Sequence, residues 1–99
     1  MPFAIVLAPE AVDDLKSLKA NVREAVRASL KAHLRHEPKK TSRSRIKRLR
    51  RFDRPQYRLR VSDVRVFYDV ENSTVEVLAI VNKSEAAATF VMPGSSQRS

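Results

Sequence analysis

Hydrophobic and polar residues alternate along the second half of the chain, a pattern typical of β-strands with one buried face. Between Gln56 and Val81 the alternation is interrupted at Ser62-Asp63 and again at Asn72-Ser73. Breaks of two residues between alternating runs are typical of tight β-hairpins. We therefore predict three antiparallel strands joined by two hairpins.

Loops of two residues also fix which residues face each other across the strands. In the first hairpin we expect Arg60 opposite Arg65, and in the second we expect Val66 opposite Ala79. One face is then wholly apolar and must hold the rest of the fold. The opposite face is predicted to carry arginines beside hydrophobic residues: Arg58, Arg60, Arg65, Phe67, Leu78 and Ile80.

The first half of the chain begins with a short apolar run, which is followed by two helical patterns. Residues 3–7 are suited to a first strand. Pro9 is suited to the first position of a helix that continues to about Ala20. Asn21 is expected to cap a second helix, with Glu24 completing a capping box. Its apolar positions recur every four residues, at Val22, Val26, Leu30 and Leu34.

These elements predict an α+β fold. The expected order is an N-terminal strand, an antiparallel helical hairpin ending before Pro38, and a mainly antiparallel twisted sheet of three to four strands. Residues 45–50 are expected to form a short edge strand, and Pro55 marks the entry to the next strand. We expect a single domain over residues 1–92 and a disordered tail over residues 93–99.

Positive charge is concentrated in one part of this 99-residue chain. Residues 39–65 contain twelve Lys and Arg against two acids, which gives 12 − 2 = +10, whereas the net charge of the whole chain is +9. So local a field favours a polyanion as ligand over a general effect on solubility. With no Cys and only two His, His33 and His36, no metal or cofactor is expected. The absence of a long apolar run favours a cytoplasmic protein without a membrane span.

The predicted face gathers like charges for which folding alone gives no reason, because Arg60 directly opposite Arg65 is destabilising. An anion between the arginines would turn this repulsion into attraction, and arginine's planar fork suits phosphate oxygens. Phe67 and Phe90 are candidates for stacking on bases. The competing interpretation is a solvated outer face that guards against aggregation. Tyr57 and Tyr68 fall on the apolar face and are expected in the core.

The segment Tyr57-Arg58-Leu59-Arg60-Val61-Ser62-Asp63-Val64-Arg65-Val66-Phe67-Tyr68-Asp69-Val70 resembles a motif of the RelE/ParE superfamily of bacterial toxins. Pro9-Glu10-Ala11, Arg48-Leu49 and the stretch 75–81 agree with the same superfamily. The resemblance covers about residues 3–90. It implies a small cytoplasmic toxin, the RelE-like fold, and an antitoxin with an acidic or amphipathic segment as partner.

The resemblance also implies two activities. RelE-like members cleave mRNA in the ribosomal A site, while ParE-like members poison DNA gyrase. The superfamily pattern places catalytic roles on Arg58, Arg60, Arg65 and Lys83. Basic and aromatic residues expected to bind RNA are Lys47, Arg48, Arg50, Arg51, Phe67 and Phe90.

Two departures from the superfamily pattern bear on activity. Arginine stands where the ribonucleases often have lysine, and Phe90 replaces a tyrosine. Arginine is a poor base because it hardly ever loses its proton. The leading hypothesis is a ribosome-dependent mRNA endoribonuclease in which Lys83 acts chiefly as an acid. The alternatives are a gyrase inhibitor without chemistry of its own and an inactive member that still binds antitoxin.

Overall fold

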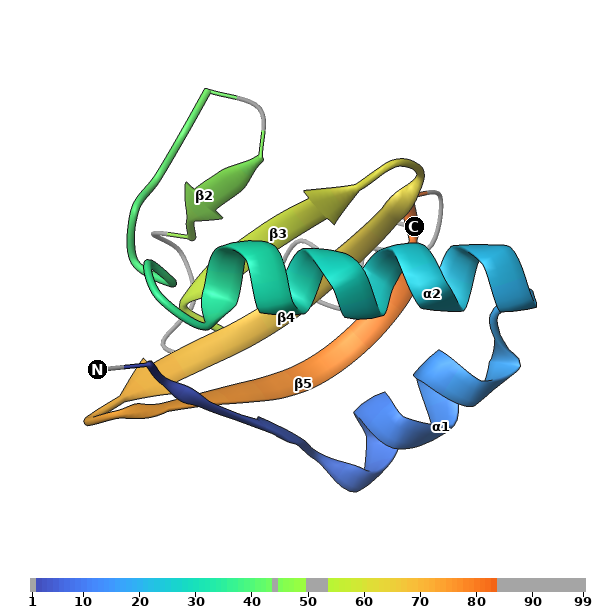
Figure 1. Cartoon of the computed structure of the whole chain (residues 1–99), viewed down its shortest axis with the longest axis horizontal. Helices are drawn as coiled ribbons and strands as arrows, with labels where there is room; N and C mark the ends of the chain where they lie inside the picture. Colours follow the sequence, from blue (N-terminus) through green and yellow to red (C-terminus); the bar gives the residue numbers. More distant parts are fainter. Residues whose placement is uncertain (1, 44, 50–53, 84–99) are drawn as a thin grey trace, which may run out of the picture.

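Within residues 2–43, 45–49 and 54–83, which the computed structural model describes, five strands form one mixed sheet (Figure 1). The strands are β1 (Ala4–Leu7), β2 (Ile46–Arg48), β3 (Tyr57–Val61), β4 (Val64–Glu71) and β5 (Thr74–Asn82). Their order across the sheet is β1-β5-β4-β3-β2. β1 runs parallel to β5, and the other neighbours are antiparallel. The predicted α+β fold is confirmed, including the short basic strand β2.

Two helices lie between β1 and β2 in the sequence. α1 (Pro9–Ser17) starts at Pro9, as predicted, and α2 (Ala20–Ser29) continues into a π-helical turn η1 (Leu30–Leu34). α2 runs back across one face of the sheet (Figure 1). No helix in the described part of the chain is long and apolar enough to cross a membrane.

The predicted capping box at the start of α2 is wrong. The cap position is Lys19, which has an extended backbone and makes no side-chain capping bond. The carbonyl oxygen of Lys19 accepts a hydrogen bond from the N–H of Arg23 at 2.8 Å. Because Leu18 and Lys19 alone form the extended break, the helix begins at Ala20. Asn21 is therefore two residues past the cap position and cannot cap the helix.

The core lies between the helices and the apolar face of β3, β4 and β5. The helical stripe predicted from the four-residue spacing supplies Val26, Leu30 and Leu34, all buried, while Val22 is partly buried against them. Tyr57 and Tyr68 stack with ring centroids 5.4 Å apart. The Tyr68 hydroxyl donates to the carbonyl of Pro38 at 2.6 Å. The prediction that both tyrosines are core residues is confirmed.

Both hairpins have the predicted two-residue turns, and Ser62 and Asn72 each have φ of 55°. In the first hairpin Arg60 lies opposite Arg65, as expected. In the second the expected pairing of Val66 with Ala79 is wrong, because a β-bulge shifts the register between Phe67 and Tyr68. Val66 pairs with Ile80, which leaves Leu78 as the extra residue in β5.

The bulge exchanges the two faces of β5 beyond Leu78. Ile80 is 2% exposed and belongs to the core, not to the outer face as predicted. Ala79 and Val81 instead lie opposite Phe67 and Arg65. The hydrophobic neighbours of the arginines are therefore Ala79 and Val81.

α1 lies against β5 where β1 has ended, since the last pair between these strands is Leu7 with Val77. There the carboxylate Oδ2 of Asp14 accepts a hydrogen bond from the backbone N–H of Ile80 at 3.0 Å. The side chain of a helix thus satisfies a strand amide that no neighbouring strand reaches. Residues 84–91, expected to form a terminal helix or extended segment, and the tail 93–99 lie outside the described residues.

Candidate nucleic-acid interface

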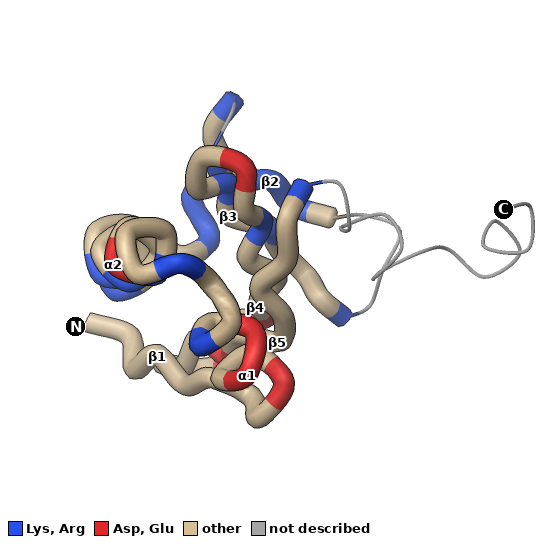
Figure 2. Tube along the Cα trace, turned by 90° about the vertical axis from the view of Figure 1, so that its right-hand side faces the viewer, with Lys and Arg blue, Asp and Glu red and all other residues tan. Residues whose placement is uncertain are grey.

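Four basic residues share the outer face of the sheet, the face opposite the helices. Arg60 pairs with Arg65 across β3 and β4, and Lys47 on β2 pairs with Arg58 on β3. Alternation along β3 places both of its arginines on the same side, because Tyr57, Leu59 and Val61 point into the core. We call this set (Lys47, Arg58, Arg60 and Arg65) the arginine face. Figure 2 shows the basic positions of the sheet gathered around β2 and β3.

Arg58 lies at the centre of this face and is half-buried. Its Nε is buried and has no hydrogen-bond partner among the described residues. Burial, followed by the charges of Arg65 and Arg60, lowers the pKa of the Arg58 guanidinium below its ordinary value. The group remains a cation at neutral pH. The positive charge of Arg58 is therefore held at a position where loss of solvation and the charges of Arg65 and Arg60 disfavour it.

Arg65 and Arg60 differ in how they are held. Arg65 is 7% exposed, and its Nη1 donates to the carbonyls of Ser62 at 3.0 Å and Val64 at 3.2 Å. These two bonds fix the guanidinium over the β3–β4 turn and use a single nitrogen. Arg60 is exposed and makes no side-chain hydrogen bond or ion pair within the part of the chain that the structure describes. One arginine is thus preoriented, and its neighbour is free to adapt.

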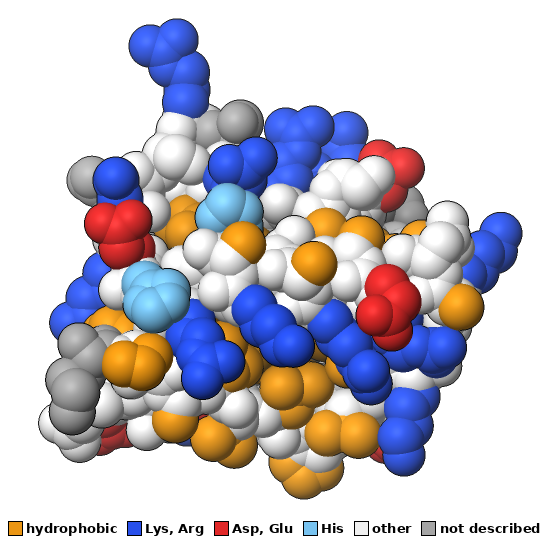
Figure 3. All heavy atoms as spheres, viewed as in Figure 1, with side chains coloured by type: hydrophobic (Ala, Val, Ile, Leu, Met, Phe, Trp, Pro, Cys, Tyr) orange, Lys and Arg blue, Asp and Glu red, His pale blue; other side chains and the backbone are white. Residues whose placement is uncertain are grey.

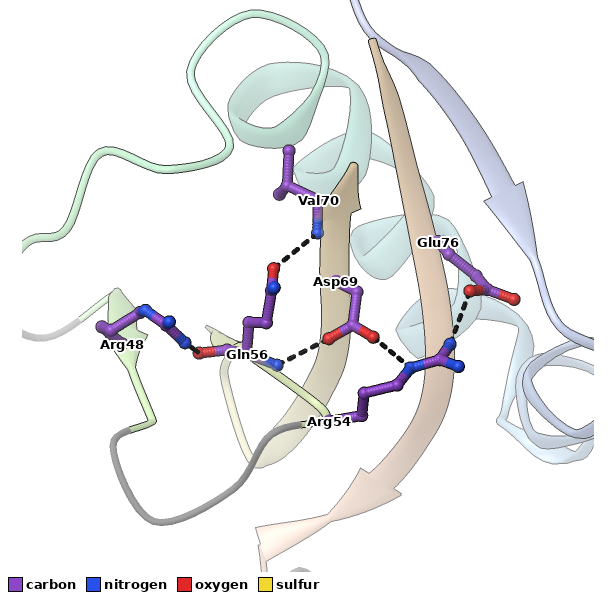
Figure 4. A network of polar contacts seen from close by, with 6 residues as sticks. All are labelled: Arg48, Arg54, Gln56, Asp69, Val70 and Glu76. Atoms are coloured by element: carbon purple, nitrogen blue, oxygen red, sulfur yellow. Dashed lines mark hydrogen bonds and ion pairs between the residues drawn. The ribbon is translucent and has the colours of Figure 1, made fainter. Parts of the chain in front are cut away.

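A polar network occupies the other end of the same outer face (Figure 4). Asp69, 8% exposed, accepts from Arg54 Nε at 2.5 Å and from the backbone N–H of Gln56 at 2.7 Å. Arg54 Nη2 also donates to Glu76 at 2.7 Å. The hydrogen bond from Arg54 to Asp69 is the main cause that raises the pKa of Arg54. Arg54 therefore pairs with both Asp69 and Glu76, and its single positive charge offsets one of their two negative charges.

The sequence pattern does not reveal this network, because Arg54 lies fifteen positions before Asp69, within a run of basic residues. A signal was present in the second hairpin. Its turn places Asp69 directly opposite Glu76, and two facing carboxylates favour a cation between them. Since Arg54 fills that place, these carboxylates do not serve as partners for Arg58, Arg60 or Arg65.

The stacking role predicted for Phe67 is not supported by its surroundings. Phe67 lies opposite Arg58 on the outer face, but it is only 4% exposed. A ring so covered offers almost no surface to a base, so its contribution is to fill the layer between Arg58 and Ala79. Phe90, the other predicted stacking residue, lies outside the described residues.

The other basic residues predicted to bind RNA do not all lie on one face of the sheet. Lys47 is exposed on the arginine face, whereas Arg48 lies opposite Tyr57, its guanidinium 5.1 Å from the ring centroid. Arg48 Nη1 also donates to the Gln56 carbonyl at 3.0 Å, so this residue fastens β2 to β3 on the helix side. Arg50 and Arg51 lie outside the described residues.

Lys83 is at the end of the sheet that carries the Arg60–Arg65 pair. It follows Val81, the cross-strand neighbour of Arg65, by two residues. Its backbone N–H donates to the carbonyl of Asp63 at 2.6 Å, and its side chain is exposed. The predicted proton donor is therefore close to the β3–β4 turn, beside the arginine face.

The two histidines lie away from this face. His33 belongs to η1 and is half-buried, and His36 follows it on the surface. Partial burial, followed by the charge of Arg45, lowers the pKa of His33. Among the described residues no three His, Asp or Glu side chains group as a metal site would require. The chemistry available at the arginine face is charge stabilisation, with Lys83 as a nearby amine.

This combination of fold and basic face agrees with a known family. The model of the family described as "ParE toxin of type II toxin-antitoxin system, parDE" matches residues 5–87. The chain belongs to this family. The match covers both helices and all five described strands except Ala4, the first residue of β1. No curated protein matched the toxin by sequence.

Solved structures show the same fold. The M. tuberculosis RelBE2 toxin–antitoxin complex contains a chain 24% identical to this toxin, with a TM-score of 0.67, covering 83% of this chain and 99% of that one. For the RelB–RelE complex of Methanococcus jannaschii the values are 17%, 0.66, 86% and 98%. For a doubly substituted E. coli RelE toxin in the free state they are 18%, 0.56, 90% and 92%. At these identities the likeness supports the fold alone.

Proposed function

We propose that the toxin binds a phosphate of single-stranded RNA on the arginine face and cleaves mRNA on the ribosome. The observation that carries this proposal is the buried Nε of Arg58, which lacks an acceptor among the described residues and faces two further arginines. A phosphate would supply the acceptor and offset the repulsion between the three cations. The carboxylates of the same face are engaged by Arg54.

Cleavage by the neighbouring 2′-hydroxyl forms a bond from O2′ to phosphorus and breaks the bond from phosphorus to O5′, and the hydroxyl proton passes to solvent water. Negative charge grows on the phosphoryl oxygens in the transition state, and we assign its stabilisation to Arg58, Arg60 and Arg65. The leaving O5′ gains a proton, for which Lys83 is our candidate donor. The ribosome contributes alignment of the attacking hydroxyl.

Primer extension on mRNA from a translating extract tests the proposal. Wild-type toxin is expected to produce discrete cuts in ribosome-bound mRNA, and the double variant Arg58→Gln/Arg60→Gln to cut at least about a hundred-fold more slowly. The matched control is Lys16→Gln/Lys19→Gln, which removes the same charge from exposed positions on and beside α1. Equal cutting by both double variants would contradict a phosphate role for the arginine face.

The proposed partner of the toxin is an antitoxin. Two of the similar solved structures are complexes of a RelE or RelBE2 toxin with its antitoxin, and the matched family is defined by toxin–antitoxin systems. With a net charge of +9, the toxin is expected to favour an antitoxin that is acidic where the two meet.

A second candidate function is inhibition of DNA gyrase without cleavage. It is favoured by the ParE family match and by the chemistry of the arginine face, where arginines replace groups that exchange protons readily. Supercoiling of relaxed plasmid by purified gyrase separates the two functions. A gyrase inhibitor stops supercoiling and leaves ribosome-bound mRNA uncut, whereas the proposed ribonuclease gives the opposite pair of results.

A further inference from the structure

The turn between β3 and β4 contacts two of the residues assigned to the proposed reaction. The carbonyl of Ser62 accepts a hydrogen bond from Arg65 Nη1 at 3.0 Å. The next carbonyl, that of Asp63, accepts from the backbone N–H of Lys83 at 2.6 Å. Figure 1 shows this turn beside the end of β5. Two consecutive carbonyls therefore hold a residue that stabilises the transition state and the candidate proton donor.

Ser62 has an unusual backbone conformation. Its φ of 55° lies in the left-handed region, which is unfavourable for a residue with a Cβ atom. The Ser62 side chain is exposed and forms no hydrogen bond within the part of the chain that the structure describes, so it does not explain this conformation. Unfavourable backbone conformations persist where the surrounding structure holds them, and they gather at functional sites. The conformation of Ser62 is therefore a candidate functional feature.

The conformation of Ser62 also determines where the turn carbonyls point. Because peptide units are planar, the backbone angles of a turn residue fix the directions of the neighbouring carbonyl groups. A change of φ at position 62 would turn the carbonyls of Ser62 and Asp63 away from their donors. Arg65 would keep only the carbonyl of Val64, at 3.2 Å, and its guanidinium would be held at one point instead of two. Every charge of the arginine face would be retained.

The turn between β4 and β5 has the same form at a different place. Asn72 also has φ of 55°, and this turn too contains two residues. Here the carbonyl of Ser73 accepts from the backbone N–H of Ala4 at 2.8 Å, which attaches β1 to the sheet. The two turns lie at opposite ends of β4. Asn72 therefore provides a matched control for Ser62.

We propose that Ser62 is a positioning residue for mRNA cleavage, an inference that rests on the proposed function. Its left-handed backbone directs two carbonyls that hold the Arg65 guanidinium and Lys83 at a fixed spacing. The turn uses Nη1 of Arg65, whereas Nε and Nη2 form no hydrogen bond among the described residues and remain for phosphoryl oxygens. Groups oriented in advance stabilise a transition state without reorganising during the reaction.

The competing interpretation is that the turn serves only the stability of the hairpin. Substitutions at Ser62 and Asn72 would then lower stability alike, and neither would change the rate of the chemical step in the folded toxin. The proposal instead requires that substitutions at Ser62 slow cleavage and that matched substitutions at Asn72 do not.

Alanine and valine at the two turn positions test the proposal. Both disfavour the left-handed region, valine more strongly because it is branched at Cβ. A misplacement of about 1 Å costs about 100-fold in rate, so kcat on ribosome-bound mRNA should fall at least about five-fold in Ser62→Ala and about thirty-fold in Ser62→Val. KM should change less than about three-fold, because every basic group is retained. Asn72→Ala and Asn72→Val should change kcat less than about three-fold.

Two controls separate positioning from loss of the fold. Ser62→Asn should keep kcat within about three-fold of the wild type, because asparagine tolerates the left-handed conformation. Urea unfolding establishes that each variant is folded at the temperature of the assay. Ser62→Ala is the milder change and provides the test if Ser62→Val does not fold. Equal kcat in Ser62→Ala and Asn72→Ala would overturn the proposal.

A measurement on the free toxin reports on Arg65 without catalysis. NMR follows the exchange of guanidinium hydrogens with water, which is slowed by hydrogen bonding. Ser62→Ala is expected to speed exchange at the Arg65 guanidinium at least about three-fold, whereas Asn72→Ala should leave it unchanged. Unchanged exchange at Arg65 in Ser62→Ala would overturn the proposal.

The outcomes distinguish this proposal from the proposed function. Wild-type toxin that leaves ribosome-bound mRNA uncut would overturn the proposed function and the role of Ser62 in cleavage together. Wild-type toxin that cuts mRNA, with Ser62 variants as active as the matched Asn72 variants, would overturn the role of Ser62 alone. A loss of kcat confined to the Ser62 variants, with faster exchange at Arg65, would support both.

Discussion

Arg58 is held in an unfavourable state that an anionic ligand would relieve. Its Nε is buried without an acceptor among the described residues, and its charge faces Arg60 and Arg65. A buried donor without a partner costs about 1–3 kcal/mol. An unpaired buried donor that lowers the stability of the unliganded protein is stronger evidence for a binding residue than a positive charge alone.

The first prediction concerns Arg58→Met, which keeps the length of the side chain and removes its charge and donors. The free energy of unfolding, measured with urea, is expected to rise by about 1 kcal/mol because the unpaired donor is gone. Affinity for a single-stranded RNA oligonucleotide is expected to fall at least ten-fold, or about 1.4 kcal/mol. Lys19→Met, at an exposed position, should change neither quantity. A less stable Arg58→Met protein would mean that Arg58 serves the fold.

The second prediction concerns Tyr68 and pH. Burial, followed by the nearby Tyr57, raises the pKa of the Tyr68 hydroxyl above its ordinary value of 10.0. The unfolded chain therefore ionises first, so this contribution to stability is complete below about pH 10 and is lost as the pH rises further. Tyr68→Phe should lower stability at neutral pH by about 1 kcal/mol, through loss of the bond to Pro38, and flatten the alkaline decline.

Urea unfolding between pH 8 and pH 11 measures this effect. Tyr57→Phe retains the Tyr68 hydroxyl and should keep most of the decline. If Tyr68→Phe declined as steeply as the wild type, other groups would be responsible for the alkaline loss.

At the residue scale, the sequence predicted the arginine face because two-residue turns determine which residues are opposite. Arg58, Arg60 and Arg65 follow from the first hairpin alone. The sequence did not predict that Phe67, on the same face, is covered, or that Arg48 lies against Tyr57 on the other side. Those outcomes depend on packing between elements, which local spacing does not determine.

At the scale of the elements, the pairing within the β4–β5 hairpin could not be predicted fully from the sequence. Every residue from Val77 to Val81 is apolar, so the pattern does not show which of them face the core and contains no sign of a bulge. The structure places Leu78 outside the ladder and turns Ile80 into the core. The existence of the strands and the positions of both turns were predictable, but the parallel pairing of β1 with β5 and the register shift inside β5 were not.

The third prediction concerns the attachment of β3 to β4. Asp69 joins Arg54 to the backbone of Gln56, and the Gln56 side chain accepts from the Val70 N–H at 3.0 Å. Asp69→Ala should lower the free energy of unfolding by about 2 kcal/mol, because it leaves the partly buried Gln56 amide and the Nε of Arg54 without their acceptor. The midpoint of urea unfolding measures the loss. Glu71→Ala, an exposed acid on the same strand, should cost less than about 0.5 kcal/mol.

On the scale of the whole molecule, the two positive surfaces lie on opposite sides of one sheet. The arginine face belongs to the strands, whereas a second row of basic residues lies along α2 and η1 (Figure 3): Arg23, Arg27, Lys31 and Arg35. A chain with a net charge of +9 would attract any polyanion at long range. Which ligand binds on which side then depends on short-range contacts. The arginine face offers guanidinium groups on neighbouring strands, whereas the helix side offers basic residues beside apolar ones.

The fourth prediction uses salt to count phosphate contacts on the arginine face. For single-stranded RNA, the slope of log affinity against log salt is roughly −0.7 for each phosphate neutralised. Four contacts would give a slope of roughly −3. Arg60→Gln should make the slope less steep by about 0.7, whereas Arg27→Gln should leave it unchanged. Fluorescence anisotropy with a short RNA provides the slopes, and an equal effect of both variants would argue against a localised RNA site.

The hydrogen bond from the Ile80 amide to Asp14 affects how copies of this protein meet one another. Strand edges with open amides recruit further strands and lead to fibres or swapped assemblies. Past the end of β1, a helix side chain already occupies the amide at which such recruitment would begin. The carboxylate of Asp14 is therefore expected to oppose edge-to-edge association of two molecules at this part of the sheet.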